Sequence, residues 1–165
     1  MHSFTVADWQ PFFTAVVSAA AALTGLLFVA VSINLEHILK GPSMLPSRAA
    51  ETLASLLFVV ISSALALVPQ NVRLLGAEIL VIVVPLLVIT LRIQLRFRRQ
   101  HPDSPLLWSA SRITISAAAT IPGTLAGLSF LAHWGGGFYW LVPASLLGIA
   151  GAGYGAWVLL VEIVR

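Results

Sequence analysis

Cysteine is absent from this sequence, and charged residues are scarce. None of the 165 residues is Cys, and Asp, Glu, Lys and Arg together make up 9% of the chain. The absence of cysteine excludes disulfides, thiolate metal sites and covalently attached haem. Because a typical soluble domain is about 25% charged, the scarcity of charge excludes the water-facing surface of an ordinary globular protein.

Apolar residues fill most of the remaining sequence. They make up 59% of the chain, and its mean hydropathy is +0.98. Five apolar runs of roughly 20 residues occur, and a helix of that length crosses the hydrocarbon core of a bilayer. The sequence therefore predicts an all-α membrane protein, a bundle of five transmembrane helices in a single domain over residues 1–165, with no soluble domain. The predicted helices cover about residues 11–35, 49–69, 74–97, 112–133 and 138–163.

Basic residues are distributed unevenly between the two sides of such a bundle. Of the nine Lys and Arg residues, only Arg73 falls on the side of the second linker. Cytoplasmic linkers carry an excess of Lys and Arg, so we expect the N-terminus outside and the C-terminus in the cytoplasm. Aromatic residues then gather at the outer interface, as in an aromatic belt: Trp9, Phe12, Phe13, Trp134, Tyr139 and Trp140. This asymmetry explains the basic pI of the chain, and we expect no nucleic-acid partner.

Small residues recur at a spacing of four in the last two predicted helices. Lipid gives helices no hydrophobic drive to associate, so close contact depends on small residues that let backbones approach. Such faces serve packing within one subunit or a seam between copies, and the second interpretation predicts a homo-oligomer. The expected helix-packing residues are Gly123, Gly127, Ala144, Gly148, Gly151, Ala152 and Gly155.

Glu78 is the clearest charge at membrane depth. It lies about one turn inside the outer end of the third predicted helix, where charged residues are costly and are functional candidates. In a symmetric oligomer Glu78 would form a ring of carboxylates near the outer mouth of a path with an apolar middle. The alternative is a boundary residue that snorkels to the interface or pairs with Arg73.

A second set of polar residues falls at the inner ends of the helices, and we expect these residues to lie at one depth. They are Asn34, Glu51, Arg92, Arg96, Arg112 and Glu162. Because an unpaired carboxylate just inside the hydrocarbon is costly, we expect Glu51 and Glu162 to pair with two of the three arginines. Arg92, Arg96 and Arg99 share one helix face and fit an anionic lipid headgroup. Ordinary anchoring by basic residues at the cytoplasmic interface explains them as well.

Patterns for catalysis and metal binding are weak. Ser129 and His133 lie four residues apart, just ahead of three glycines, an arrangement superficially like that of a serine hydrolase. However, Phe130 replaces the glycine of a nucleophile elbow, and no acid lies nearby in the sequence. The four histidines do not occur at metal-ligand spacings. We therefore expect no enzyme activity, no catalytic residue, no metal and no cofactor.

Two apolar segments resemble a group of small bacterial inner-membrane proteins. The segments are residues 20–35, AAALTGLLFVAVSINL, and residues 156–163, AWVLLVEI. Some members of this group are described as modulators of a membrane-bound ATP-dependent protease. The resemblance implies a multi-pass protein of the bacterial inner (plasma) membrane, with Asn34 and Glu162 as family features. It implies no activity.

The sequence leaves two classes of function open. The first is a homo-oligomeric pore or transport path for ions or small solutes, with the path beside the third or fifth predicted helix. The alternative is an accessory or regulatory subunit of a larger membrane complex, such as a membrane protease or transporter, without catalysis of its own. The expected partners are the lipid bilayer, further copies of the chain and, in the alternative, another membrane protein.

Overall fold

The described part of the chain is helical, without a strand. The structure is a computed structural model and describes residues 6–40, 44–100 and 106–164. Short connections join the helices, as expected where backbone polar groups must be satisfied within each segment. The helices are α1 (Val6–Ile33), α2 (Leu35–Lys40), α3 (Met44–Leu67), α4 (Val72–Gln100), α5 (Leu106–Ala132) and α6 (Gly137–Val164).

Four of these helices are long and apolar enough to cross a membrane, as in a multi-pass membrane protein. The four candidate spans are Val6–Ile33, Leu45–Leu67, Val72–Arg92 and Gly137–Val161. In α5 a shorter apolar segment covers Ala117–Ala132. The fifth crossing and the orientation therefore stay predictions.

The short helix α2 does not appear among the helices predicted from the sequence. It begins directly after Asn34, where α1 ends. The side chain of Asn34 donates a hydrogen bond from Nδ2 to the carbonyl oxygen of Ala30 at 2.9 Å. The carbonyl oxygen of Asn34 accepts a hydrogen bond from the N–H of Ile38 at 2.9 Å, as an N-cap residue does. Asn34 thus closes one helix and starts the next.

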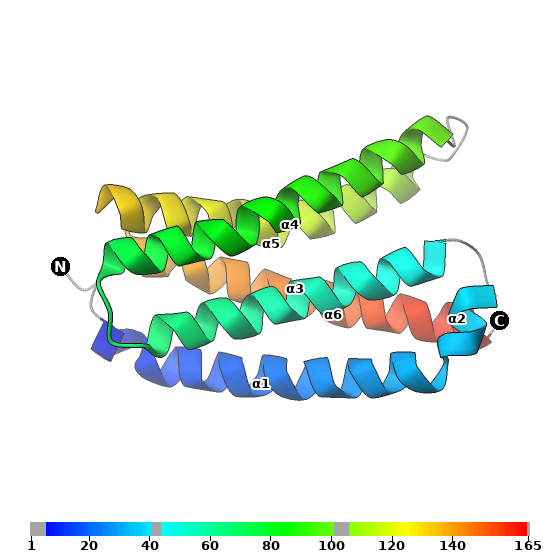
Figure 1. Cartoon of the computed structure of the whole chain (residues 1–165), viewed down its shortest axis with the longest axis horizontal. Coiled ribbons are helices and arrows are strands. Elements are labelled where there is room, and N and C mark those ends of the chain that lie inside the picture. Colours follow the sequence, from blue (N-terminus) through cyan, green and yellow to red (C-terminus); the bar gives the residue numbers. More distant parts are fainter. Residues whose placement is uncertain (1–5, 41–43, 101–105, 165) are drawn as a thin grey trace.

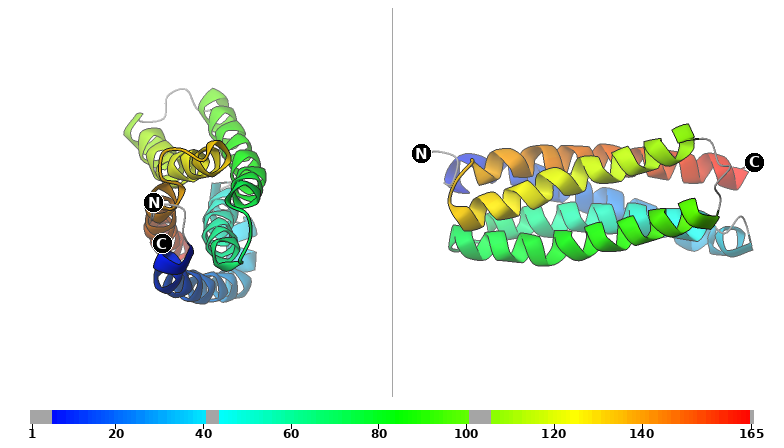
Figure 2. Two further views of the ribbon diagram at one scale, coloured as in Figure 1. Left: turned by 90° about the vertical axis from the view of Figure 1, so that its left-hand side faces the viewer. Right: turned by 90° about the horizontal axis from the view of Figure 1, so that it is seen from above.

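The two central helices are α3 and α6. They lie between the α4–α5 hairpin on one side and α1 on the other (Figures 1 and 2). The main helix neighbours are α1 with α3, α3 with α6, α6 with α5, and α5 with α4. Toward the end that carries α2, α4 diverges from α3 (Figure 1). We call this end the inner end and the opposite one the outer end, following the predicted orientation.

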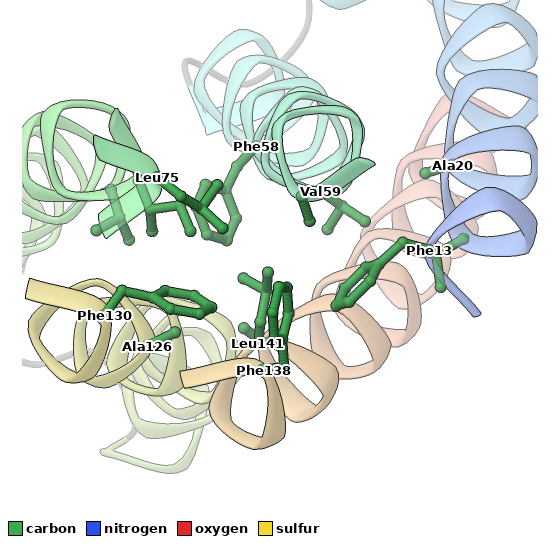
Figure 3. Close-up of a cluster of buried hydrophobic side chains, with 14 residues drawn as sticks. Phe13, Ala20, Phe58, Val59, Leu75, Ala126, Phe130, Phe138 and Leu141 are labelled. Atoms are coloured by element: carbon green, nitrogen blue, oxygen red, sulfur yellow. The ribbon is translucent and has the colours of Figure 1, made fainter. Parts of the chain in front are cut away.

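An aromatic core fills the bundle near the outer end (Figure 3). Phe13 of α1, Phe58 of α3, Phe130 of α5 and Phe138 of α6 are each at most 2% exposed. The ring of Phe138 lies 4.9 Å from that of Phe130 and 5.7 Å from that of Phe13, measured between centroids. Because lipid tails are as apolar as these rings, their stabilising contribution comes from close contact rather than from exclusion of water. Phe138 thereby joins α1 to α5.

Glycines set the closest helix contacts. A Cβ atom on Gly76 of α4 would lie 2.8 Å from the carbonyl oxygen of Gly127 on α5. A Cβ on Gly127 would lie 2.7 Å from Cγ of Leu80, and one on Gly123 would lie 2.8 Å from Cζ of Phe58. These distances are shorter than any side-chain carbon tolerates, so the absence of a side chain at these positions allows the helices to approach.

The small residues of α6 face α3 of the same subunit. A Cβ on Gly148 would lie 2.6 Å from Cγ2 of Val59, and one on Gly155 would lie 2.5 Å from Oγ1 of Thr52. Gly148 lies four residues from Ala144 and from Ala152, whereas Gly155 lies four residues from Gly151. Both glycines pack within the subunit. Ala144 and Ala152 are buried as well, and Gly151 is partly buried.

Candidate functional site

Glu78 lies at the outer end of α4, where Gln70 holds its carboxylate. Gln70 stands in the connection between α3 and α4, and its Nε2 donates a hydrogen bond to Oε2 of Glu78 at 2.8 Å. The same nitrogen donates to the carbonyl oxygen of Leu65, in the last turn of α3, at 3.2 Å. An amide NH₂ has two hydrogens to donate, so Gln70 serves both acceptors. One side chain therefore ties the end of α3 to the second turn of α4.

Arg73 is not positioned to neutralise this carboxylate. The two residues are five positions apart on one helix, which separates them by about 140° around the axis. Arg73 is exposed, and its N–H donates to Oδ1 of Asn71 at 3.0 Å. Asn71 is thus the N-cap of α4. In the described part of the chain, Glu78 accepts its hydrogen bond from a neutral amide.

Glu78 belongs to an uncovered face of α4. This outer α4 face consists of Leu74, Glu78, Val81 and Pro85, which lie within about 60° of one another around the helix axis. It points away from the side on which Gly76 meets α5. Leu74, Val81 and Pro85 are exposed, and Glu78 is half-buried. Because Glu78 lies about 9 Å along the axis from Val72, the face presents an acid among apolar side chains at membrane depth.

Four of the six residues expected to form an inner polar layer have described side chains, and these belong to three different parts of the bundle. Arg92 and Arg96 are exposed on α4, which diverges from α3 at this end (Figure 1). Glu51 is half-buried near the start of α3. Asn34 lies at the junction of α1 and α2, where its side chain donates a hydrogen bond to the carbonyl oxygen of Ala30. The side chains of Arg112 and Glu162 lie outside the described residues. The predicted pairing of Glu51 and Glu162 with arginines therefore stays a prediction.

Ser129 and His133 form the end of α5. The N–H of Trp134 donates to the carbonyl oxygen of Ser129 at 3.1 Å, and the N–H of His133 donates to that of Phe130 at 3.4 Å. With His133 at a φ of 55°, these two bonds make a Schellman motif, a common helix ending with a left-handed residue after the last turn. The hydroxyl of Ser129 donates to the carbonyl oxygen of Trp134. Ser129 is thus engaged in closing the helix.

Buried hydroxyl groups lie on α3 and α6. Ser62, Ser63 and Ser145 are at most 1% exposed. Ser62 donates to the carbonyl oxygen of Val59 at 3.3 Å and Ser145 to that of Leu141 at 2.9 Å. Within the described residues, Oγ of Ser63 is buried without a hydrogen-bond partner. An unsatisfied buried polar atom is costly, so Ser63 is a weak point of the packed interior.

Gln70 is the residue of this site that sequence reasoning missed. It lies in the connection before α4 begins at Val72, so helix periodicity could not pair it with Glu78. The polar run of Gln70 and Asn71 after Pro69, followed by a single acid inside an apolar helix, was the available signal.

No group of three or more His, Asp or Glu that could hold a metal ion occurs among the described residues.

Known proteins supply no further evidence about this site. The suspected membership in the group of small bacterial inner-membrane proteins rests on two apolar segments and stays a prediction. Any functional interpretation must therefore come from the residues and contacts of this chain. Comparison of the chain with family models, with curated proteins and with solved structures gives no match.

Proposed function

We propose that this protein is an accessory or regulatory subunit of a larger membrane complex and contacts its partner through the outer α4 face. The partner is a second membrane protein, because the face lies within a candidate span. The observation that carries the proposal is the position of Glu78, an acid on an uncovered helix face that is held by the neutral Gln70.

The carboxylate of Glu78 needs more polar contacts than the described residues of its own subunit provide. An ionised carboxylate has about four acceptor positions, and Gln70 occupies one of them. Lipid tails offer no donors, and charges at membrane depth accordingly face protein or water-filled cavities. A partner helix that places a basic or hydroxyl side chain at this level would meet the requirement. The apolar residues Leu74, Val81 and Pro85 would surround that contact.

Three points favour this function over the homo-oligomeric path that the sequence predicts first. Gly148 and Gly155, for which a seam between copies was one of two interpretations, pack against α3 of their own subunit. A symmetric contact through the outer α4 face would also bring one Glu78 toward another, and like charges across an interface repel. In addition, Phe58, Phe130 and Phe138 occupy the space between helices near the outer end (Figure 3).

The proposal is tested by placing a photo-cross-linking amino acid at Val81, which is 72% exposed. The matched control carries the same group at Leu26 of α1, which is 68% exposed on another side of the bundle. In native membranes we expect one discrete protein adduct at Val81 and none at Leu26. The mass added should differ from the 17.6 kDa of a second copy. The yield should fall when Glu78→Gln is combined with the Val81 probe.

Two outcomes contradict the proposal. Cross-linking to lipid alone at Val81 would show that the face has no protein partner. An adduct of twice 17.6 kDa would instead establish a contact between copies and favour the path. Cation flux into proteoliposomes, compared between the unmodified protein and Glu78→Gln, would then decide whether the oligomer conducts.

A further inference from the structure

Three of the four arginines at the inner end of α4 share one face of the helix. Arg92, Arg96 and Arg99 are all exposed. Their spacing of four and three residues places them within about 60° around the helix axis and along about 10 Å of its length. α4 contains a single acid, Glu78, which lies about 21 Å along the axis from Arg92. The three guanidinium groups therefore form an uninterrupted basic ladder on this helix.

The depth of the ladder matches the phosphate layer of a membrane. The candidate span of α4 runs from Val72 to Arg92, which is about 30 Å long and equals the thickness of the hydrocarbon core of a bilayer. Arg92 then lies at the boundary of the hydrocarbon. Arg96 and Arg99 lie about 6 and 10 Å farther along the axis, where lipid headgroups are.

Exposed apolar side chains continue the same surface into the hydrocarbon. Val88 and Ile89 lie one turn before Arg92, and Leu95 lies beside the ladder, all of them exposed. Toward this end α4 diverges from α3 (Figure 1), and the side chains of Arg92, Arg96 and Arg99 are exposed. A lipid whose acyl chains lie along Val88 and Ile89 would carry its headgroup at the level of the arginines.

We propose that Arg92, Arg96 and Arg99 bind the phosphate-bearing headgroup of an anionic lipid as a defined site on each subunit. The planar guanidinium group binds phosphate through two parallel hydrogen bonds, and adjacent arginines bind one diester together. The inference is independent of the proposed function, because it concerns the inner end of α4 and needs no protein partner. A defined site differs from general anchoring by basic residues in two ways. Its binding is selective for the lipid headgroup, and it saturates as the lipid concentration rises.

The test titrates purified protein in detergent with phosphatidylglycerol or phosphatidylcholine and counts retained lipids by native mass spectrometry. The variant carries Arg92→Gln, Arg96→Gln and Arg99→Gln. The matched control loses the same charge elsewhere through Lys40→Gln, Arg48→Gln and Arg73→Gln. Each basic residue near an anionic lipid contributes roughly a fivefold gain in affinity, so three contribute about 100-fold. We expect that loss in the variant and a saturable, unchanged affinity for phosphatidylglycerol in the control.

Several outcomes would overturn the site. Equal losses of phosphatidylglycerol affinity in the variant and the control would show only general anchoring by basic residues. Retention of phosphatidylcholine to the same extent as phosphatidylglycerol would show the same. Displacement of the lipid by millimolar inorganic phosphate would reassign the ladder to a soluble anion. Circular dichroism verifies that the triple variant folds; if it does not, Arg92→Lys replaces it, because lysine keeps the charge but lacks the bidentate geometry. Unchanged lipid affinity in Arg92→Lys would then contradict the proposal.

Discussion

Gly76 and Gly127 lie face to face where α4 crosses α5, and each occupies the space that a side chain on the other would need. A Cβ on Gly76 would lie 2.8 Å from the carbonyl oxygen of Gly127 and 2.9 Å from the backbone nitrogen of Leu131. Backbone atoms cannot rotate away as a flexible side chain can. The crossing therefore depends on glycine at position 76. A Cβ on Gly127 would lie 2.7 Å from Cγ of Leu80 and 3.2 Å from the carbonyl oxygen of Gly76.

Substitution at this crossing should destabilise the protein. We expect Gly76→Ala to lower the free energy of unfolding by about 1–3 kcal/mol, as overpacking of a tight contact does. Gly25→Ala is the control, since nothing lies within 4 Å of a Cβ at that position of α1. That control should be neutral or stabilising by up to about 1 kcal/mol, because alanine favours the helix more than glycine. Equal effects of the two variants in detergent unfolding experiments would contradict the close contact.

The hydrogen bond between Gln70 and Glu78 should contribute more to stability than the exposed ion pair between Glu36 and Lys40. Gln70→Leu removes the hydrogen-bond donor to the half-buried carboxylate of Glu78. This change should lower the free energy of unfolding by about 1.5–3 kcal/mol. The control is Glu36→Gln, which breaks the exposed pair between Glu36 and Lys40 and should cost less than about 1 kcal/mol. Thermal unfolding of both variants measures the difference. A smaller effect for Gln70→Leu would mean that the connection between α3 and α4 does not depend on this bond.

Removal of the unsatisfied hydroxyl of Ser63 should stabilise the bundle. Ser63→Ala eliminates a buried polar atom that has no partner among the described residues, and the penalty for such an atom is about 1–3 kcal/mol. Ser145→Ala, at an equally buried position, removes a hydroxyl that is bonded to Leu141 and should be neutral or destabilising. The free energy of unfolding should thus rise in the first variant only. A loss of stability in Ser63→Ala would reveal an essential polar contact at that site.

Cysteine labelling tests the predicted orientation and the crossing of α5. The absence of native cysteine makes single-cysteine variants directly interpretable. Trp134, which is 80% exposed, follows the outer end of α5, and Ser104 precedes its inner end in the sequence. In intact cells a membrane-impermeant maleimide should label Trp134→Cys and spare Ser104→Cys until the membrane is opened. Labelling of both positions, or of Ser104→Cys alone, would contradict the topology.

The helical spans could be predicted because the bilayer restricts the backbone strongly. A segment in lipid must satisfy its own polar groups, so length and apolarity alone indicate a helix. The neighbours of each helix could not be predicted in the same way. Lipid-facing and protein-facing residues are equally apolar, as Val59 in the interior and Val81 on the surface illustrate. The central position of α3 and α6 therefore had no signal in hydropathy.

The candidate site also contains one residue that the sequence could predict and one that it could not. Glu78 could be singled out because one acid within an apolar helix is conspicuous. Its partner Gln70 could not, because their contact depends on how the chain turns between α3 and α4. The role of Ser129 was equally hidden, since the Schellman motif depends on the backbone angle of His133, a position where glycine or asparagine is usual.

The central position of α6 has a consequence for biogenesis. α6 follows the other described helices in the sequence, yet it packs against both α3 and α5. During synthesis, α1 can pair with α3, and α4 with α5, while α6 is still inside the ribosome. The two pairs have few contacts with each other until Phe138 and Gly148 arrive to fill the space between them. Nascent chains that stall before residue 137 should therefore persist as two loosely associated hairpins, open to membrane quality-control proteases.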